Sequence, residues 1–157
     1  MTQPYRIELL TAQDRSAFAS GSDALDRYLQ QQAKQDMRRR VASCFVAIDN
    51  TDAIAGFYTI AASSLVLDLL PAEQARCLPR YPTVPAVLLG RLAVAQAHQG
   101  KRLGGALVAD ALLRATRAEV MAYAMIVDAK DEAAVLFYQH LGFTRLGDDG
   151  RRLIRAL

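Results

Sequence analysis

The stretch HQGKRLGGAL, from His98 to Leu107, most constrains how this chain folds, because its three glycines separate two apolar segments. The run AVLLGRLAV (86–94) precedes it, and a helical pattern follows. Glycines between a buried strand and a helix start leave backbone N–H groups free and let a ligand approach the main chain. The stretch therefore predicts a strand–loop–helix unit whose loop binds an anion.

Two common phosphate-binding motifs do not fit this loop. A nucleotide P-loop needs G-x-x-x-x-G-K-[ST], but Ala95 stands at the first glycine position and Arg102 follows Gly100–Lys101. The dinucleotide motif G-x-G-x-x-G fails because the glycine spacing differs. From the residues alone, a helix start made permissive by glycine, with no ligand, is an open alternative.

Size and composition favour an ordinary folded protein. The chain has 157 residues, 52% hydrophobic and 22% charged, so we expect a single domain over residues 1–157. No apolar run approaches the ~20 residues of a membrane span, and the N-terminus lacks the pattern of a secretory signal. We therefore expect a cytoplasmic protein with no membrane partner. The formal net charge of +3 leans toward anionic partners.

Cysteine and histidine are too scarce to suggest redox or metal chemistry. Cys44 and Cys77 lie far apart and are expected to be reduced, partly buried thiols. With two histidines in the chain, we expect no metal site.

Hydrophobic periodicity predicts a mixed α/β fold. A long helix capped by Ser22 carries Leu25, Leu29, Ala33 and Met37 at four-residue steps, with Tyr28 beside them. Other helices are expected over 70–78, 103–117 and 131–141, and strands over 41–48, 53–67, 86–94, 121–129, 142–147 and 151–157. The segment PRYPTVP (79–85) is expected to be a loop because of its prolines.

The segment RLAVAQAHQGKRLGGALVADAL resembles the acetyl-CoA-binding segment of the GNAT acetyltransferase superfamily, whose signature is [RQ]-x-x-G-x-[GA]. The resemblance implies a mostly antiparallel twisted sheet, splayed at the cofactor site and flanked by helices. It also implies that loop amides hold the diphosphate of coenzyme A and that the strand at 92–94 pairs with the pantetheine arm. The implied cofactor-binding residues are Leu92, Ala93, Val94, Gln99, Gly100, Lys101, Arg102, Leu103, Gly104, Gly105, Ala133 and Phe137.

Arg102 stands where the superfamily usually has glycine. A left-handed backbone there would cost a non-glycine residue about 1–2 kcal/mol. A guanidinium beside a diphosphate would return part of that through charge-assisted hydrogen bonds. We therefore expect cofactor binding to survive the substitution.

A second segment, VDAKDEAAVLFYQHLGF, resembles the superfamily motif A-x-x-F-Y-x-x-x-G-F. Phe137–Tyr138 and Gly142–Phe143 match it. The resemblance implies that Tyr138 lies beside the coenzyme A sulfur and protonates the departing thiolate as the catalytic residue. A phenol with a reference pKa near 10 is protonated at neutral pH and can do so.

Three further segments carry a narrower resemblance: FASGSDALDRYLQQQAKQDMRRRVASCFVAID, GFYTIAASSLVLDLLP and LPRYPTVPAVLLGRLAV. Together they resemble the GNAT toxins of bacterial toxin–antitoxin pairs, and the likeness covers nearly the whole chain. That group acetylates the α-amine of the amino acid on a charged tRNA, which blocks translation. An α-amine with a reference pKa of about 7.7–8.0 needs no strong base, and none is evident: His98 and His140 are interpreted as loop and helix-surface residues, and Asp128 and Glu132 as solvated or structural. The expected partners are aminoacyl-tRNA, a ribbon-helix-helix antitoxin and a second copy of the chain. The expected tRNA-binding residues are Lys34, Arg38, Arg39, Arg40, Arg91, Arg151 and Arg152, with Arg155 beside them.

Two other functions stay open from the sequence. One is a GNAT acetyltransferase for protein N-termini or a small amine, since a fold does not define its substrate. The other is a catalytically impaired GNAT domain that serves as a binding module, an alternative that Arg102 favours and Tyr138 opposes.

Overall fold

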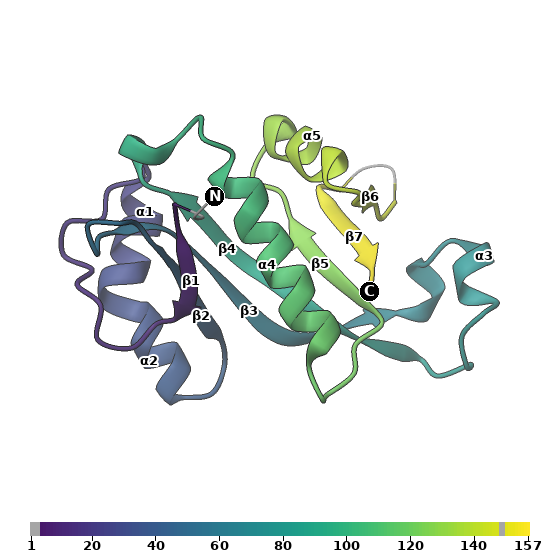
Figure 1. Cartoon of the computed structure of the whole chain (residues 1–157). Coiled ribbons are helices and arrows are strands. Elements are labelled where there is room, and N and C mark those ends of the chain that lie inside the picture. The colour runs from purple at the N-terminus through teal and green to yellow at the C-terminus, as the bar shows by residue number, and fades with distance from the viewer. Residues whose placement is uncertain (1–3, 148–149) are drawn as a thin grey trace. The chain divides into compact units, whose positions relative to one another are not determined.

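The computed structural model describes residues 4–147 and 150–157 (Figure 1). Its contacts divide the chain into two compact units. The first comprises the chain up to Ala61 together with Gly90–Ala111, and the second comprises Ala62–Leu89 with Leu112–Leu157. The single domain expected over residues 1–157 stays a prediction.

The described residues form a seven-stranded sheet in the order β1-β2-β3-β4-β5-β7-β6. Pairing is antiparallel for β1–β2, β2–β3, β5–β7 and β6–β7, and parallel for β4–β5. This confirms the mixed α/β class and a largely antiparallel sheet, whereas the splaying of its strands stays a prediction. The strands are β1 (Arg6–Leu9), β2 (Ser43–Ile48), β3 (Ile54–Val66), β4 (Thr83–Val94), β5 (Ala124–Asp128), β6 (Thr144–Arg145) and β7 (Arg152–Ala156).

Helical segments connect these strands. The predicted helices over 103–117 and 131–141 are confirmed, and the one over 70–78 is shorter than expected. The segments are α1 (Asp23–Arg27), the π turn η1 (Tyr28–Gln32), α2 (Ala33–Arg38), the 3₁₀ turn η2 (Leu67–Leu69), α3 (Ala72–Ala75), the 3₁₀ turn η3 (Gln96–His98), α4 (Leu103–Arg117) and α5 (Glu132–His140).

The predicted first helix contains a π turn, η1, in its middle. Ser22 caps it as expected, with its side chain accepting from the N–H of Leu25. Apolar residues at strict four-residue steps exceed the 3.6-residue repeat of an α-helix, so an α-helical stripe would drift by about 40° per step. A wider turn reduces that drift, and Leu29 and Ala33 are both fully buried. Arg15 donates to the carbonyls of Leu29 and Gln30 at 3.0 and 3.2 Å, which satisfies acceptors in the widened turn.

Each unit has its own apolar core. In the first unit, Leu29 and Ala33 of the helical segment pack with Val46 of β2 and Phe57 of β3. In the second unit, a separate cluster joins β4, β5 and β7 through Ala86, Ile126 and Ile154. Strand β4, which leads toward the glycine loop, contributes Ala93 to the first cluster and Ala86 to the second.

Two stretches differ from the sequence-based expectation. Strand β1 was not predicted, because its four residues form a strand only by pairing with Phe45–Ile48 of β2. The loop expected over 79–85 is wrong at its end, since β4 begins at Thr83 and contains Pro85. Proline lacks an N–H but keeps its carbonyl, and the carbonyl of Pro85 accepts from Tyr123 at 2.8 Å.

The two thiols lie in different surroundings. Cys44 is buried, and burial raises the pKa of its thiol to about 12. Cys77 is exposed, so the expectation of partial burial is wrong for it. Among the described residues, no helix is both long and apolar enough to cross a membrane.

We expect Gly56→Ala to lower the free energy of unfolding by about 1–3 kcal/mol, as overpacking does. A Cβ at Gly56 would lie 2.9 Å from the carbonyl oxygen of Ala93 and 3.0 Å from a methyl carbon of Leu107. Urea denaturation measures the change. Gly150→Ala is the matched control, because the nearest atom to its added Cβ is 3.8 Å away. Equal stability of the two variants would contradict the close approach at Gly56.

Candidate functional site

The loop between η3 and α4 presents a row of backbone N–H groups without partners. Among the residues that the structure describes, no acceptor lies within hydrogen-bonding distance of any N–H from Gly100 to Gly105. The first N–H of α4 with a backbone acceptor is that of Ala106, which bonds to the carbonyl of Arg102 at 3.2 Å. Consecutive unpartnered amides at the start of a 15-residue helix favour a bound anion.

Gly100 gives this loop its shape and its open space. Its φ of +80° lies in the left-handed region, and a Cβ there would meet no atom within 4 Å. Lys101 and Arg102 follow it with exposed side chains. The loop thus combines unpartnered amides with two exposed cations, which fits a phosphorylated ligand.

Arg102 adopts the strained backbone that its departure from the usual glycine suggested. Its φ is +63°, in the left-handed region. Its carbonyl accepts the first hydrogen bond of α4, so the strain lies directly at the helix N-terminus. The cost of about 1–2 kcal/mol for a non-glycine residue with a left-handed backbone therefore applies to Arg102.

Strand β4 leads into the loop. Its register with β5 runs from Ala86↔Ala124 to Leu89↔Val127, and β4 continues beyond that pairing to Val94. Leu92 and Val94 are half-buried and Ala93 is buried. That the backbone of Leu92–Val94 pairs with the pantetheine arm, as the resemblance implies, stays a prediction.

Tyr138 lies on α5, in the second unit, with its ring enclosed by aromatic side chains. Phe137 and Phe143 meet its ring edge to face, with centroids 5.0 and 5.6 Å away. Tyr138 is 9% exposed, and burial raises the pKa of its phenol to about 12. Its hydroxyl has no hydrogen-bond partner among the described residues, yet it is not sealed from solvent. A protonated phenol is thus available to a ligand.

The local fold of α5 sets the position of Tyr138. The side chain of Asp131 caps the helix by accepting from Ala134 at 2.8 Å. Gly142 ends it with a φ of +91°, and the N–H of Phe143 bonds to the carbonyl of Tyr138 at 3.1 Å. Of the two other residues expected on this helix, Phe137 is half-buried and Ala133 is exposed.

The expected basic residues of the first unit are accessible. Arg38, Arg39 and Arg40 are exposed at the end of α2, and Lys34 is half-buried. Arg40 has a φ of +61°, so it occupies a left-handed position at a helix end where glycine is usual. No sequence pattern predicted that strain.

Arg91 is held in place by an aromatic ring. Its guanidinium carbon lies 3.7 Å from the ring centroid of Tyr28. Tyr28 stacks on Phe57 of the core and donates its hydroxyl to Asp36 at 2.7 Å. Stacking leaves the guanidinium edge, with its N–H donors, exposed. Arg91 is therefore a preorganised cation.

The basic residues of the second unit already have partners. Arg152 forms a bidentate pair with Asp128, at 2.8 and 3.0 Å. Arg151 donates to the carbonyl of Lys130 at 2.9 Å, and Arg155 to that of Leu141 at 2.6 Å. Asp128, interpreted from the sequence as solvated or structural, is an exposed carboxylate paired with Arg152. Because of these partners, Arg151, Arg152 and Arg155 have fewer N–H donors available for the phosphates of a nucleic acid.

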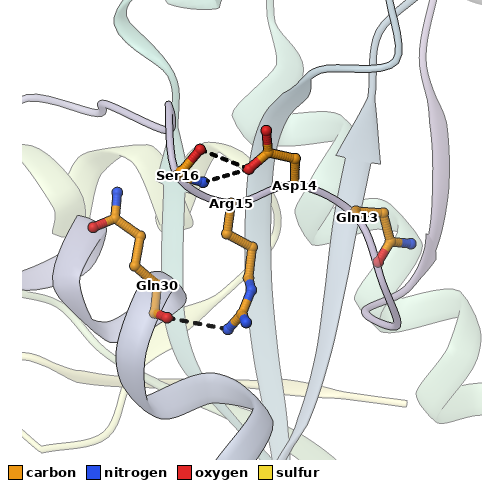
Figure 2. Close-up of a pocket in the computed structure, with 5 residues that line it drawn as sticks. All are labelled: Gln13, Asp14, Arg15, Ser16 and Gln30. Carbon is orange, nitrogen blue, oxygen red and sulfur yellow. Dashed lines mark hydrogen bonds between the residues drawn. The ribbon is translucent and has the colours of Figure 1, made fainter.

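A pocket in the first unit lies apart from the residues that the sequence analysis selected. Figure 2 shows its lining by Gln13, Asp14, Arg15, Ser16 and Gln30. Asp14 accepts from the backbone and side chain of Ser16, and Arg15 donates to the Gln30 carbonyl. Because these groups satisfy one another, we assign no ligand to this pocket. Among the described residues, no group of three or more His, Cys, Asp and Glu could hold a metal ion.

Sequence reasoning missed the surroundings of His98. The imidazole contacts both Tyr5 and Asp49, which lie 93 and 49 residues away in the chain. No local pattern encodes such distant contacts. The position of His98 immediately before the glycine loop was the only available signal.

Comparison with known proteins identifies close relatives. Residues 40–145 match the family described as the acetyltransferase (GNAT) domain. The tRNA-acetylating toxin of Mycobacterium tuberculosis is 34% identical over 142 residues, which cover 89% of this chain and 82% of that protein.

Solved structures are similar over almost their whole length. AtaT complexed with acetyl-methionyl-tRNAfMet is 30% identical, with a TM-score of 0.88 over 97% of this chain and 94% of that one. A tyrosine-to-phenylalanine mutant of the AtaT toxin, bound to the C-terminus of the antitoxin AtaR and acetyl-CoA, is 26% identical. Its TM-score is 0.79 over 98% of this chain and 94% of that chain.

We expect Arg102→Gly to raise the free energy of unfolding by up to about 1.5 kcal/mol. Glycine removes a strain of about 1–2 kcal/mol but adds about 0.5–1 kcal/mol of backbone entropy loss on folding. Arg102→Ala, which keeps the strain, should give no gain. Both variants should bind pyrophosphate more weakly in calorimetry, because both lack the guanidinium. Equal stability of the two variants would contradict the strain.

Proposed function

This chain belongs to the GNAT acetyltransferase family, and from that premise we propose that it transfers the acetyl group of acetyl-CoA to the α-amine of the amino acid on a charged tRNA. The observation that carries this proposal is the 34% identity with a tRNA-acetylating toxin over 89% of the chain. The similarity to AtaT in complex with acetyl-methionyl-tRNAfMet, with a TM-score of 0.88, supports the same acceptor. Such an acceptor implies a cytoplasmic enzyme that blocks translation.

The diphosphate of coenzyme A would bind the unpartnered amides from Gly100 to Gly105. The exposed cations Lys101 and Arg102 support this assignment. Gln99 closes the base of the loop, donating to the carbonyl of Val94 at 3.0 Å. The backbone of Leu92, Ala93 and Val94 would pair with the pantetheine arm, because β4 runs on past its register with β5. Phe137 and Ala133, on α5, are the remaining proposed contacts.

For acetyl transfer, the protein needs to position the amine against the thioester and to supply one proton to the departing sulfur. Acetyl-CoA supplies an activated acetyl group when bound. Amide formation removes one proton from nitrogen and adds one to sulfur, so the protons balance. Tyr138 would donate its hydroxyl proton toward the sulfur and recover one released by the amine. The phenol pKa of about 12 keeps this proton in place at neutral pH.

Basic residues would hold the tRNA by its phosphates. Arg91 is the strongest of these, since stacking on Tyr28 fixes its guanidinium at little further entropy cost on binding. Lys34, Arg38, Arg39 and Arg40 would extend the surface. Arg151 and Arg152 are weaker members of the set because they are engaged with neighbouring groups.

An antitoxin is the proposed protein partner. The AtaT mutant bound to the C-terminus of AtaR supports an antitoxin for this chain as well. A ribbon-helix-helix antitoxin and a homodimer both remain proposals that rest on the resemblance. Size-exclusion chromatography with and without the product of a neighbouring gene tests both.

We expect Tyr138→Phe to lower the single-turnover rate of acetylation by about 10²–10⁴-fold, because general acid catalysis is worth that much. The wild-type rate should rise with pH as the α-amine, of reference pKa about 7.7–8.0, loses its proton. It should then stay level to pH 9.5, because burial raises the pKa of Tyr138 to about 12. Mass spectrometry of the charged tRNA measures the rates.

Tyr123→Phe is the control for this change. Tyr123 is half-buried in the same unit, and its hydroxyl makes one long contact with Gln74 at 3.4 Å. It should acetylate at the wild-type rate. A fully active Tyr138→Phe enzyme would remove Tyr138 from the mechanism. A wild-type rate that fell above pH 9 would show a less basic phenol than the structure gives.

We expect Arg91→Ala to raise the KM for aminoacyl-tRNA by about 5–20-fold and to reduce the salt slope of binding by about one. The dissociation constant for acetyl-CoA should not change. Arg80→Ala, at another exposed arginine, is the control and should behave as wild type. Unchanged tRNA affinity in Arg91→Ala would exclude Arg91 from the surface.

A further inference from the structure

The imidazole of His98 uses both of its ring nitrogens within the chain. Nδ1 lies 2.8 Å from the hydroxyl of Tyr5, and Nε2 lies 3.1 Å from Oδ2 of Asp49. Because an ionised carboxylate only accepts hydrogen bonds, Nε2 of His98 is the donor to Asp49, and Nδ1 faces the hydroxyl of Tyr5. The side chains of His98 and Asp49 are 19% and 11% exposed. A histidine that serves only as a surface loop residue does not need this network.

Asp49 is held in place by hydrogen bonds other than the one to His98. Its other oxygen, Oδ1, accepts from the N–H and hydroxyl of Thr51 at 2.8 and 2.7 Å and from the N–H of Ala53 at 3.0 Å. These hydrogen bonds, with that of His98, lower the pKa of Asp49 to about 2 against the effect of burial. The carboxylate is therefore a rigid, ionised anchor in the turn between β2 and β3.

His98 is the last residue of η3, and one residue, Gln99, separates it from the unpartnered amides that begin at Gly100. At the start of η3, the N–H of Gln96 bonds to the carbonyl of Ala19 at 2.8 Å. The side chain of Gln99 donates to the carbonyl of Ser20, also at 2.8 Å. These two hydrogen bonds hold the start of the glycine loop against segment 19–20. The side chain of His98 joins the start of the loop to the β2–β3 turn and to Tyr5.

We propose that His98 is a positioning residue for acetyl transfer: it fixes the turn before Gly100 so that the amides of residues 100–105 are ordered before the cofactor diphosphate arrives. The physical reason is preorganisation, since a loop that is already ordered loses less entropy when the ligand binds. His98 needs no contact with the cofactor and takes no proton from the substrate. The inference rests on the proposed diphosphate site.

Full-length His98→Ala, His98→Gln and wild-type enzymes test it, with acetyl-CoA and S-acetylpantetheine as donors. S-Acetylpantetheine lacks the diphosphate. In His98→Ala, we expect the dissociation constant and KM for acetyl-CoA to rise about tenfold, a loss of about 1.4 kcal/mol, with kcat nearly unchanged. The kcat/KM for S-acetylpantetheine should stay at the wild-type value. His98→Gln keeps a donor for Asp49 and should recover most of the affinity.

His140→Gln is the matched control, because His140 is the other histidine and is exposed on α5. It should bind both donors as wild type does. Wild-type affinity of His98→Ala for acetyl-CoA would overturn the inference, as would equal weakening toward both donors. If the wild-type enzyme itself gained nothing from the diphosphate, the proposed binding site would fail instead, so the two failures are distinguishable.

Discussion

The N–H groups that follow η3 are the feature on which the rest of this structure depends. A helix start leaves its first N–H groups without intrahelical acceptors, and here the run extends over six consecutive residues, 100–105, whose N–H groups have no acceptor among the described residues. Hydrogen bonds of Gln96, His98 and Gln99 hold the start of the loop against neighbouring segments. In the proposed function, these N–H groups are the donors that the diphosphate of coenzyme A would satisfy.

Strained arginines follow the same pattern. Arg40, Asp52 and Arg102 are the described non-glycine residues with positive φ. Arg40 ends a helix and Arg102 begins one, and glycine would be less strained at each position. Residues in sparsely populated backbone regions cluster at functional sites. Both arginines are exposed, as a phosphate-binding role requires.

Sequence patterns predicted most of the elements and the glycine loop, because periodicity and glycine spacing are local signals. They also placed Arg102 where the backbone turns out to be left-handed. They did not predict β1, which is a strand only through its pairing with β2. The stacking of Arg91 on Tyr28 and the contacts of His98 depend on residues dozens of positions apart. One amino-acid sequence, read for local patterns, does not indicate such distant contacts.

The π turn at Tyr28–Gln32 is an α-helix that has accommodated one surplus residue. Its exposed Gln31 is the residue least tied to the interior. Without Gln31, the buried side chains would follow one another at intervals of four, three and four, the ordinary rhythm of an α-helix. Arg15 would then lose the carbonyls that the widened turn offers it. The widened turn therefore contacts two groups of residues at once: the apolar core that it covers, and the guanidinium of Arg15 that donates to its carbonyls.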